Sequence, residues 1–168
     1  MLFDPTLAVR LPGVPRPQGS LKIITNPRTG RAFAKNSDTT ASHRNLLVGQ
    51  LVGYWAGNQP LKCPVSVSLE FYFARPKSHY RTGRFEDELK ASAPELHDKM
   101  PDVDKLVRLM LDALTIAGVV KDDSQVFAVR GEKRWIHRND HPSTYLQVWA
   151  HEGGRVTVPT PRERGAGL

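Results

Sequence analysis

Residues 101–125 read PDVDKLVRLMLDALTIAGVVKDDSQ, and this stretch decides much of the fold. Its apolar residues recur three and four positions apart, which predicts an amphipathic helix over residues 104–117. Gly118 follows directly and suits the left-handed position at which many helices end. The predicted buried face of this helix comprises Leu106, Leu109, Met110, Ala113, Leu114 and Ala117.

The same stretch places acidic residues at both ends of the predicted helix. Asp102 and Asp104 lie at its start, and Asp122 and Asp123 follow its end. These carboxylates would repel one another unless a cation bound between them, which predicts a divalent metal site. Asp102 can approach Asp104 only from an extended lead-in, because residues two apart on a helix point in nearly opposite directions. The alternative is that the first two acids cap the helix.

Arg108 lies between two acids on the polar side of this helix. Asp104, Arg108 and Asp112 are spaced four residues apart, so they could form a ladder of i,i+4 ion pairs. The same spacing could instead present Arg108 to a phosphate whose charge develops as a bond breaks. The residues alone leave both possibilities open.

Shorter elements surround the helix. Residues 64–74 (PVSVSLEFYFA) alternate apolar and polar side chains, which predicts the clearest strand. Further strands are predicted over residues 7–14, 125–135 and 143–151, with a β-hairpin over residues 22–25 and 31–35. A first helix, capped by Ser37 or Asp38 and ending near Ala56, is predicted to bury a face of Leu46, Leu47, Gln50, Leu51, Tyr54 and Trp55.

This order of elements predicts an α+β fold. We expect one domain over residues 1–158, in which a mixed β-sheet packs against two main helices. The sequence leaves open whether the strands before and after the second helix pair in parallel. Residues 159–168 are rich in Pro, Arg and Gly and are predicted to form a disordered tail.

The composition narrows the choice of partner. The chain carries 24 Lys and Arg against 17 Asp and Glu, a formal net charge of +7, and its pI is ≈ 9.8. Such a balance favours a polyanion, above all nucleic acid. The alternative is that the charge serves solubility alone.

Other classes of protein and site are disfavoured. Cys63 is the only cysteine, so no intrachain disulfide can form. The N-terminus does not resemble a signal peptide, and no run approaches the 18 apolar residues of a membrane span. The histidines are too scattered for a zinc site. We therefore expect a soluble cytoplasmic protein without contact with a membrane.

Two basic segments carry the candidate DNA-binding residues. Between residues 75 and 99, Tyr80 and Phe85 stand among basic side chains, which would suit stacking on bases beside neutralisation of phosphates. A mobile solvated loop is the alternative. The candidates are Arg75, Lys77, Arg81 and Arg84 in this segment, and Arg16 and Lys22 in the early loop and hairpin.

Residues 101–126 (PDVDKLVRLMLDALTIAGVVKDDSQV), followed by Lys133, resemble the core motif of the RusA family of Holliday-junction resolvases. The segments RPKSHYRTGR (75–84) and VPRPQGS (14–20) are similar to phage-type members. The resemblance implies a homodimeric, Mg²⁺-dependent endonuclease, in which Mn²⁺ can substitute, that cuts four-way DNA junctions symmetrically. It also implies the cytoplasm of a bacterium or a phage-infected host.

Carried over residue by residue, the resemblance implies that Asp102, Asp104 and Asp123 are the catalytic metal-binding acids, with Asp122 as a further candidate ligand. Arg108 occupies the position of a catalytic lysine, and Lys133 joins the DNA-binding candidates. Lys105 stands where many members have asparagine. Arginine keeps the positive charge of lysine but cannot transfer a proton near neutral pH.

Two other functions fit the same residues. A metal-dependent nuclease with relaxed substrate choice would cut flaps or replication forks. A non-catalytic DNA-binding module would use the acids to bind a structural cation or to cap a helix.

Overall fold

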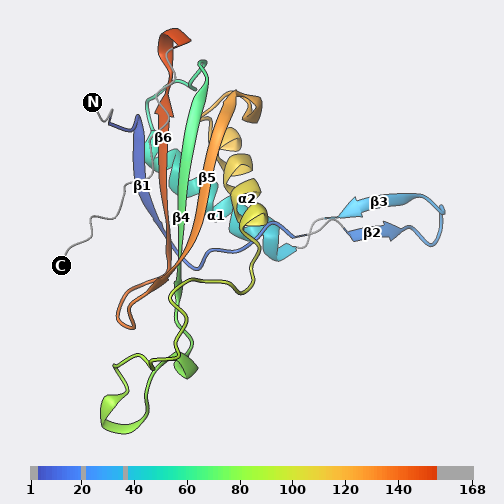
Figure 1. Ribbon diagram of the computed structural model, residues 1–168. Coiled ribbons are helices and arrows are strands. Elements are labelled where there is room, and N and C mark those ends of the chain that lie inside the picture. The colour runs from blue at the N-terminus through green and yellow to red at the C-terminus, as the bar shows by residue number, and fades with distance from the viewer. Residues whose placement is uncertain (1–3, 20–21, 36–37, 155–168) are drawn as a thin grey trace.

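A four-stranded mixed sheet forms the centre of the computed structural model, which describes residues 4–19, 22–35 and 38–154 (Figure 1). The predicted tail, residues 159–168, lies outside the described residues. The elements follow the predicted order: β1 (Leu7–Pro12), β2 (Lys22–Thr25), β3 (Ala32–Lys35), α1 (Asp38–Trp55), β4 (Val65–Ala74), α2 (Val103–Ile116), β5 (Val126–Ile136) and β6 (Ser143–Ala150).

The strands of the main sheet are ordered β1-β6-β4-β5. Strand β4 pairs in parallel with β5 and antiparallel with β6, and β1 pairs antiparallel with β6. The parallel pair answers the question that the sequence left open. A parallel pair needs a long crossover, and α2 lies in the one between β4 and β5. The predicted α+β fold with a mixed sheet and two main helices is confirmed.

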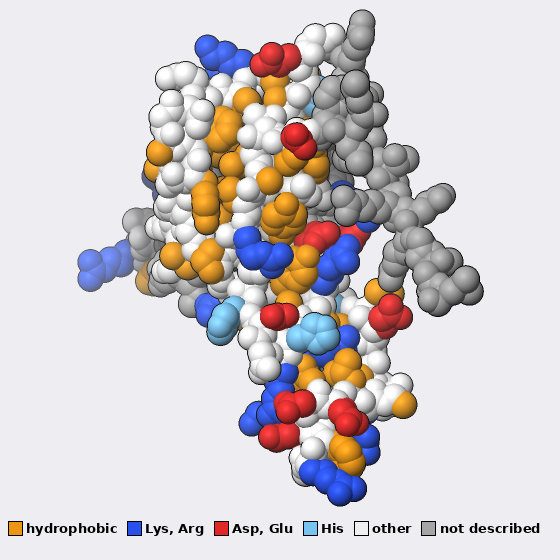
Figure 2. Space-filling view, turned by 90° about the vertical axis from the view of Figure 1, so that its left-hand side faces the viewer, with side chains coloured by type: hydrophobic (Ala, Val, Ile, Leu, Met, Phe, Trp, Pro, Cys, Tyr) orange, Lys and Arg blue, Asp and Glu red, His pale blue; other side chains and the backbone are white. Residues whose placement is uncertain are grey.

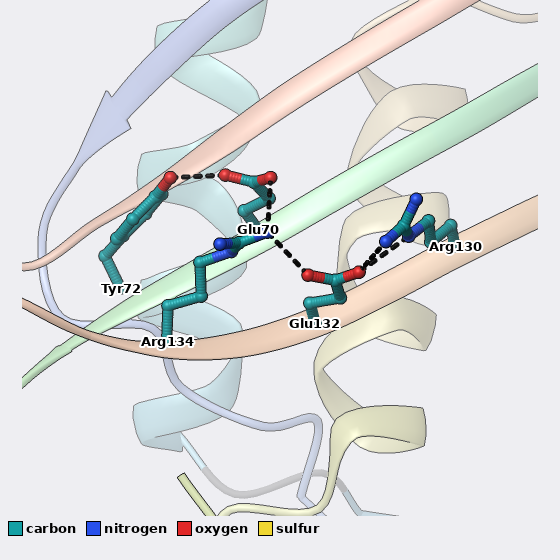
Figure 3. Close-up of polar contacts among 5 residues, drawn as sticks. All are labelled: Glu70, Tyr72, Arg130, Glu132 and Arg134. Carbon is teal, nitrogen blue, oxygen red and sulfur yellow. Dashed lines mark hydrogen bonds and ion pairs between the residues drawn. The ribbon is translucent and has the colours of Figure 1, made fainter. Parts of the chain in front are cut away.

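The two faces of the sheet differ in chemistry. Val67, Leu69 and Phe71 of β4 are buried in the core on the face that the helices cover. The opposite face carries a chain of polar contacts across β4 and β5 (Figure 3). It runs from Tyr72 to Glu70, Arg134, Glu132 and Arg130, with ion pairs of 3.2 Å from Arg134 to Glu70 and 2.7 Å from Arg134 to Glu132.

Both long helices cover the same face of the sheet (Figure 1). Leu106, Leu109, Met110, Ala113 and Leu114 of α2 are buried as predicted, and Ala117 is partly buried. The prediction for α1 was too broad, because among its six residues only the i,i+4,i+8 stripe of Leu47, Leu51 and Trp55 is buried in the core, and Val48 packs partly buried beside it. Leu46 and Tyr54 lie beside that stripe, and each is 53% exposed. No helix in the described residues is long and apolar enough to span a membrane.

Helix α2 ends at Gly118 as predicted, and the ending directs the chain towards the second acidic pair. Gly118 has φ of 72°. Its N–H donates to the carbonyl of Thr115 at 3.1 Å, and the N–H of Val119 donates to that of Leu114 at 3.0 Å. These two bonds form a Schellman motif, and the buried Val119 side chain anchors it in the core.

Residues 75–100 form a structured projection, here called the arm, at the bottom of Figure 1. The arm folds back on itself through a bridge between Tyr80 and Leu89. At its base the ring of His97 stacks on that of Trp135 with centroids 4.0 Å apart, and it also contacts Phe73. The arm is therefore attached to β4 and β5 by an aromatic cluster.

Candidate active site

A groove of about 440 Å³ runs between α2 and the edge strand β5. It collects four of the charged side chains discussed above, three from α2 and one from the short 3-10 turn η3 (Asp123–Gln125) that precedes β5. The lining residues are Val103, Asp104, Val107, Arg108, Leu111, Asp112, Asp123, Val129 and Gly131.

Gly131 sets the spacing between the two walls of the groove. A Cβ atom at this position would lie 2.7 Å from Cγ2 of Val107 and 3.3 Å from Cγ2 of Val103. Valine side chains in a helix are stiff, so they could not move aside without cost. A residue without a side chain therefore allows α2 to lie directly against β5.

Asp104 and Asp123 are the two predicted metal ligands that the structure brings to the same groove. Both are exposed, and among the described residues neither forms an ion pair. Carboxylate oxygens are the donors that Mg²⁺ prefers, so this donor set suits a hard cation. In the described part of the chain, however, no three metal-ligating side chains are grouped closely enough to hold an ion.

Asp102 lies at the start of α2 but is not among the residues that line the groove. Its backbone is extended (φ −67°, ψ 135°), as an approach to Asp104 requires. Its side chain makes no capping hydrogen bond, so capping does not account for it. Instead, its Oδ2 atom lies 2.7 Å from Nζ of Lys105. Lys105, through this hydrogen bond and its charge, lowers the pKa of Asp102, and the pKa of Lys105 is raised in return.

Lys133 is committed to the protein backbone. Its Nζ atom donates to the carbonyl oxygens of Lys99, at 2.5 Å, and Pro101, at 3.0 Å. It extends from β5 to the segment that leads into Asp102. This geometry makes Lys133 a candidate for positioning that acid.

The adjacent Asp122 and Asp123 have different environments. The side chain of Asp122 accepts a 2.9 Å hydrogen bond from the N–H of Ser124 and forms a capping box with Gln125. The hydrogen bonds from Ser124 also lower the pKa of Asp122. Asp123 lines the groove instead. Asp122 is thus occupied in building the turn that presents Asp123.

Arg108 does not take part in the ladder of ion pairs that its spacing allowed. Among the described residues it forms no ion pair with Asp104 or Asp112, although all three line the groove. Asp112 instead accepts a 2.9 Å hydrogen bond from Nε2 of Gln18, in the early loop. The guanidinium of Arg108 therefore remains free to meet an anion.

The candidate DNA-binding residues of the arm are partly engaged within it. Arg75 donates to the carbonyl of Pro94 at 2.7 Å and lies over the ring of Trp135. Arg81 pairs with Glu88 at 2.5 Å, whereas Lys77 and Arg84 are exposed and form no ion pair in the described structure. Residues 75–100 hold six Lys and Arg against five Asp and Glu. The arm's surface is accordingly mixed, with red and blue side chains side by side (Figure 2).

The early segment has a stronger positive charge than the arm. Residues 10–35 contain six Lys and Arg and no acid. Arg16 is exposed in the early loop, and Arg28 and Arg31 are exposed at the tip of the β2–β3 hairpin. Lys22 begins β2, and its side chain lies outside the described part of the chain.

Three contacting residues were missed by reasoning from the sequence. Gln18 and its partner Asp112 are 94 residues apart, and no local pattern links them. The alternation of the sequence predicts Trp135 only as a strand residue, although it stacks on His97 and donates from Nε1 to the carbonyl of Leu96. Arg138 braces the arm by pairing with Asp87 at 3.0 Å. The one available signal was the length of the polar segment 75–100, which suggests that other parts of the chain must hold it in place.

One comparison with known families bears directly on this site. The family described as Endodeoxyribonuclease RusA matches residues 12–149, which include every residue of the groove. No individual curated protein matches the chain significantly. The match extends over most of the described residues and agrees with the resemblance of the acidic core motif. The chain belongs to the RusA family of endodeoxyribonucleases, which are hydrolases that act on DNA.

Proposed function

We propose that this protein is a Mg²⁺-dependent, structure-selective endonuclease that resolves four-way DNA junctions by paired, symmetric cuts. The observation that carries the proposal is the meeting of Asp104, Arg108 and Asp123 in one groove beside an edge strand. Two carboxylates that can hold a cation and one free guanidinium that can meet a phosphate are the parts that phosphodiester hydrolysis needs.

Asp102, Asp104 and Asp123 would hold the metal in this proposal. When bound, Mg²⁺, or Mn²⁺ in its place, offsets negative charge at the attacked phosphate and the leaving oxygen. Asp102 would join the other two acids by turning away from Lys105. A rotation of one exposed side chain is a small change, since an exposed ion pair of this kind is weak. Asp122 stays in its capping role.

Arg108 would act by charge alone. An arginine side chain cannot serve as a proton donor or base near neutral pH. It can donate two parallel hydrogen bonds to phosphate oxygens, which a lysine in the same place cannot. Its freedom from Asp104 and Asp112 supports this role.

The early segment is the first candidate for holding the DNA arms. Its excess of positive charge and the exposed Arg16, Arg28 and Arg31 support contacts with phosphates. Lys22 is a further candidate in this early segment, and Lys77, Arg81 and Arg84 of the arm are the second group of candidates. We assign Arg75 and Lys133 to positioning within the protein rather than to DNA, because their side chains are engaged with backbone carbonyls.

We further propose a homodimer, since two identical sites related by a two-fold axis would match a branched DNA of similar symmetry. The family resemblance supports this dimer and a setting in the cytoplasm of a bacterium or phage-infected cell. Light scattering of the purified protein would measure the oligomeric state. A strictly monomeric protein that still makes paired cuts would contradict the dimer.

Cleavage of a four-way junction, a replication fork, a flap and a linear duplex, each with and without Mg²⁺, tests the function. We expect metal-dependent cutting of the junction in preference to the other three. Asp104→Asn and Asp123→Asn should abolish cutting while binding of the junction, measured in Ca²⁺, persists. Equal cutting of forks or flaps would replace junction resolution by a relaxed nuclease activity. If the wild type bound the junction but cut none of the substrates, the protein would be a non-catalytic DNA-binding module.

A further inference from the structure

Asp112 is the acid nearest in sequence to Arg108 on the C-terminal side of α2, and the two lie one helical turn apart on the groove. Acids and bases at i and i+4 on an exposed helix face attract one another. In the proposed function Asp104 is taken up by the metal. Asp112 is then the remaining acid of α2 that can neutralise Arg108.

Gln18 holds Asp112 from the other side. The main chain of the early loop is attached to α2 by a 3.1 Å hydrogen bond from the N–H of Gln18 to the carbonyl of Lys105. Its side-chain amide then reaches further along the helix and donates from Nε2 to Oδ2 of Asp112 at 2.9 Å. Loop and helix are thereby joined at two points, of which the second, Asp112, lines the groove.

The orientation of the Gln18 amide follows from chemistry. The atom facing Asp112 must be the donor Nε2, because Oε1 would set two acceptors against each other. In this orientation Oε1 is buried and has no hydrogen-bond partner among the described residues. A buried acceptor without a partner costs stability. In the described part of the chain, the Gln18 side chain is therefore held in this orientation by its donor contact with Asp112 alone.

We propose that Gln18 is a positioning residue that holds Asp112 away from Arg108, so that the Arg108 guanidinium stays free for the phosphate. The inference rests on the proposed function, in which Arg108 meets the scissile phosphate. Without the Gln18 amide, Asp112 turns to the nearest cation, which is one turn away on its own helix. Arg108 is then partly neutralised before the substrate arrives.

A double-mutant cycle between positions 18 and 112 tests this assignment. Junction cleavage is measured in single turnover at saturating enzyme, for the wild type, Gln18→Ala, Asp112→Asn and the double variant. Gln18→Ala should slow cleavage by about two- to fivefold, the strength of an exposed ion pair. In the Asp112→Asn background, Gln18→Ala should change the cleavage rate little, because no carboxylate at position 112 remains to pair with Arg108. Equal losses in both backgrounds would overturn the proposal.

Gln50→Ala is the matched control. Gln50 also tethers the N-terminal part of the chain, by donating from Nε2 to the carbonyl of Pro12 at 3.3 Å, and its Oε1 atom is also buried without a partner. It lies on α1 and does not line the groove. Gln50→Ala should lower the melting temperature about as much as Gln18→Ala does. Its effect on the cleavage rate should be the same whether residue 112 is Asp or Asn. If Gln18→Ala does not fold, Gln18→Met keeps the side-chain length, lacks the donor and takes its place.

Arg108→Ala separates this inference from the function on which it rests. If Arg108→Ala cleaves at the wild-type rate, the proposed role of Arg108 fails, and the inference falls with it. If Arg108→Ala is slow, and Gln18→Ala costs the same whichever residue stands at 112, only the inference fails. In the Arg108→Ala background, Gln18→Ala should cause no further slowing.

Discussion

The ammonium group of Lys133 lies 3.0 Å from the carbonyl oxygen of Pro101, the residue immediately before Asp102. A second hydrogen bond joins it to the carbonyl of Lys99 at 2.5 Å. A side chain of the edge strand therefore fixes the backbone that leads into the first acid. The aromatic base of the arm borders the same segment, since Trp135 stacks on His97.

Replacing Lys133 with methionine removes both hydrogen bonds and keeps most of the side-chain volume. We expect cleavage to fall by about ten- to a hundredfold, because misplacement of a catalytic group by as little as 1 Å can have that effect. Junction binding in Ca²⁺ should stay near that of the wild type. Lys62→Met, at an exposed lysine outside the groove and without an ion pair in the described structure, is the control. If Lys133 contacts DNA instead, Lys133→Met should weaken junction binding. The slope of the binding constant against salt concentration should then fall by the amount expected for about one phosphate contact.

Lys105→Asn tests the ion pair that holds Asp102. Removing the ammonium frees the Asp102 carboxylate for a cation, so half-maximal cleavage should need about two- to fivefold less Mg²⁺. The measurement is a Mg²⁺ titration of single-turnover cleavage. Lys62→Asn, at an exposed lysine outside the groove, controls for the change in net charge. An unchanged Mg²⁺ requirement would mean that Lys105 does not compete with the metal.

The main helices and strands could be predicted from the sequence, because burying one face of each element requires apolar residues at regular spacing. Five of the six predicted core residues of α2 are fully buried, and Gly118 ends the helix as predicted. On α1 the same reasoning failed for Leu46 and Tyr54. That helix has apolar residues on both sides of its buried stripe, so the spacing could not show which side meets the core.

The contacts that shape the site could not be predicted, because they join residues far apart in the chain. The acids themselves stand out in a basic sequence, and the structure brings Asp104 and Asp123 to one groove. Gln18 and Lys133 hold groups of the site through partners 94 and 32 residues away, and no local pattern links them to those partners. Only the folded arrangement reveals their partners.

Gly131→Ala tests how closely α2 must approach β5. The added methyl group would meet Cγ2 of Val107 at 2.7 Å, so we expect a loss of about 1–3 kcal/mol in the free energy of unfolding. Urea denaturation measures this change. The matched control is Gly53→Ala on α1, where nothing lies within 4 Å of an added Cβ. There the substitution should stabilise the protein by about 0.5–1 kcal/mol. Equal effects of the two substitutions would contradict the close approach.

His97→Phe tests the pH dependence of the arm's attachment. Burial of the ring, and then the charge of Lys133, lower the pKa of His97 in the folded protein. Above the pKa of about 6.5 that His97 has in the unfolded chain, its ring is uncharged in both the folded and the unfolded state. The contribution of His97 to stability is then fully present. As the pH falls below that value, the unfolded state takes up the proton first, and stability is lost until the lower folded pKa is passed.

Urea denaturation of the wild type at pH 7.5 and pH 5.5 should therefore show a loss of stability on acidification. In His97→Phe the ring still stacks on Trp135 but no longer titrates, so its loss should be smaller. His137→Phe, at an exposed histidine in the turn after β5, is the control and should follow the wild type. An identical pH dependence in all three proteins would show that His97 does not contribute.

The neighbouring Asp122 and Asp123 should respond differently to the same substitution. Asp122→Asn keeps an acceptor for the N–H of Ser124, so the capping box persists and cleavage should change little. Asp123→Asn removes a charge from the groove and should slow cleavage by at least about a hundredfold, with junction binding in Ca²⁺ retained. Asp122→Ala adds a further distinction: it destroys the cap and should lower both the urea midpoint and the cleavage rate, because the turn that presents Asp123 loosens. If Asp122→Asn proved as inactive as Asp123→Asn while remaining folded, Asp122 would be a ligand and its cap would have to open when the metal binds.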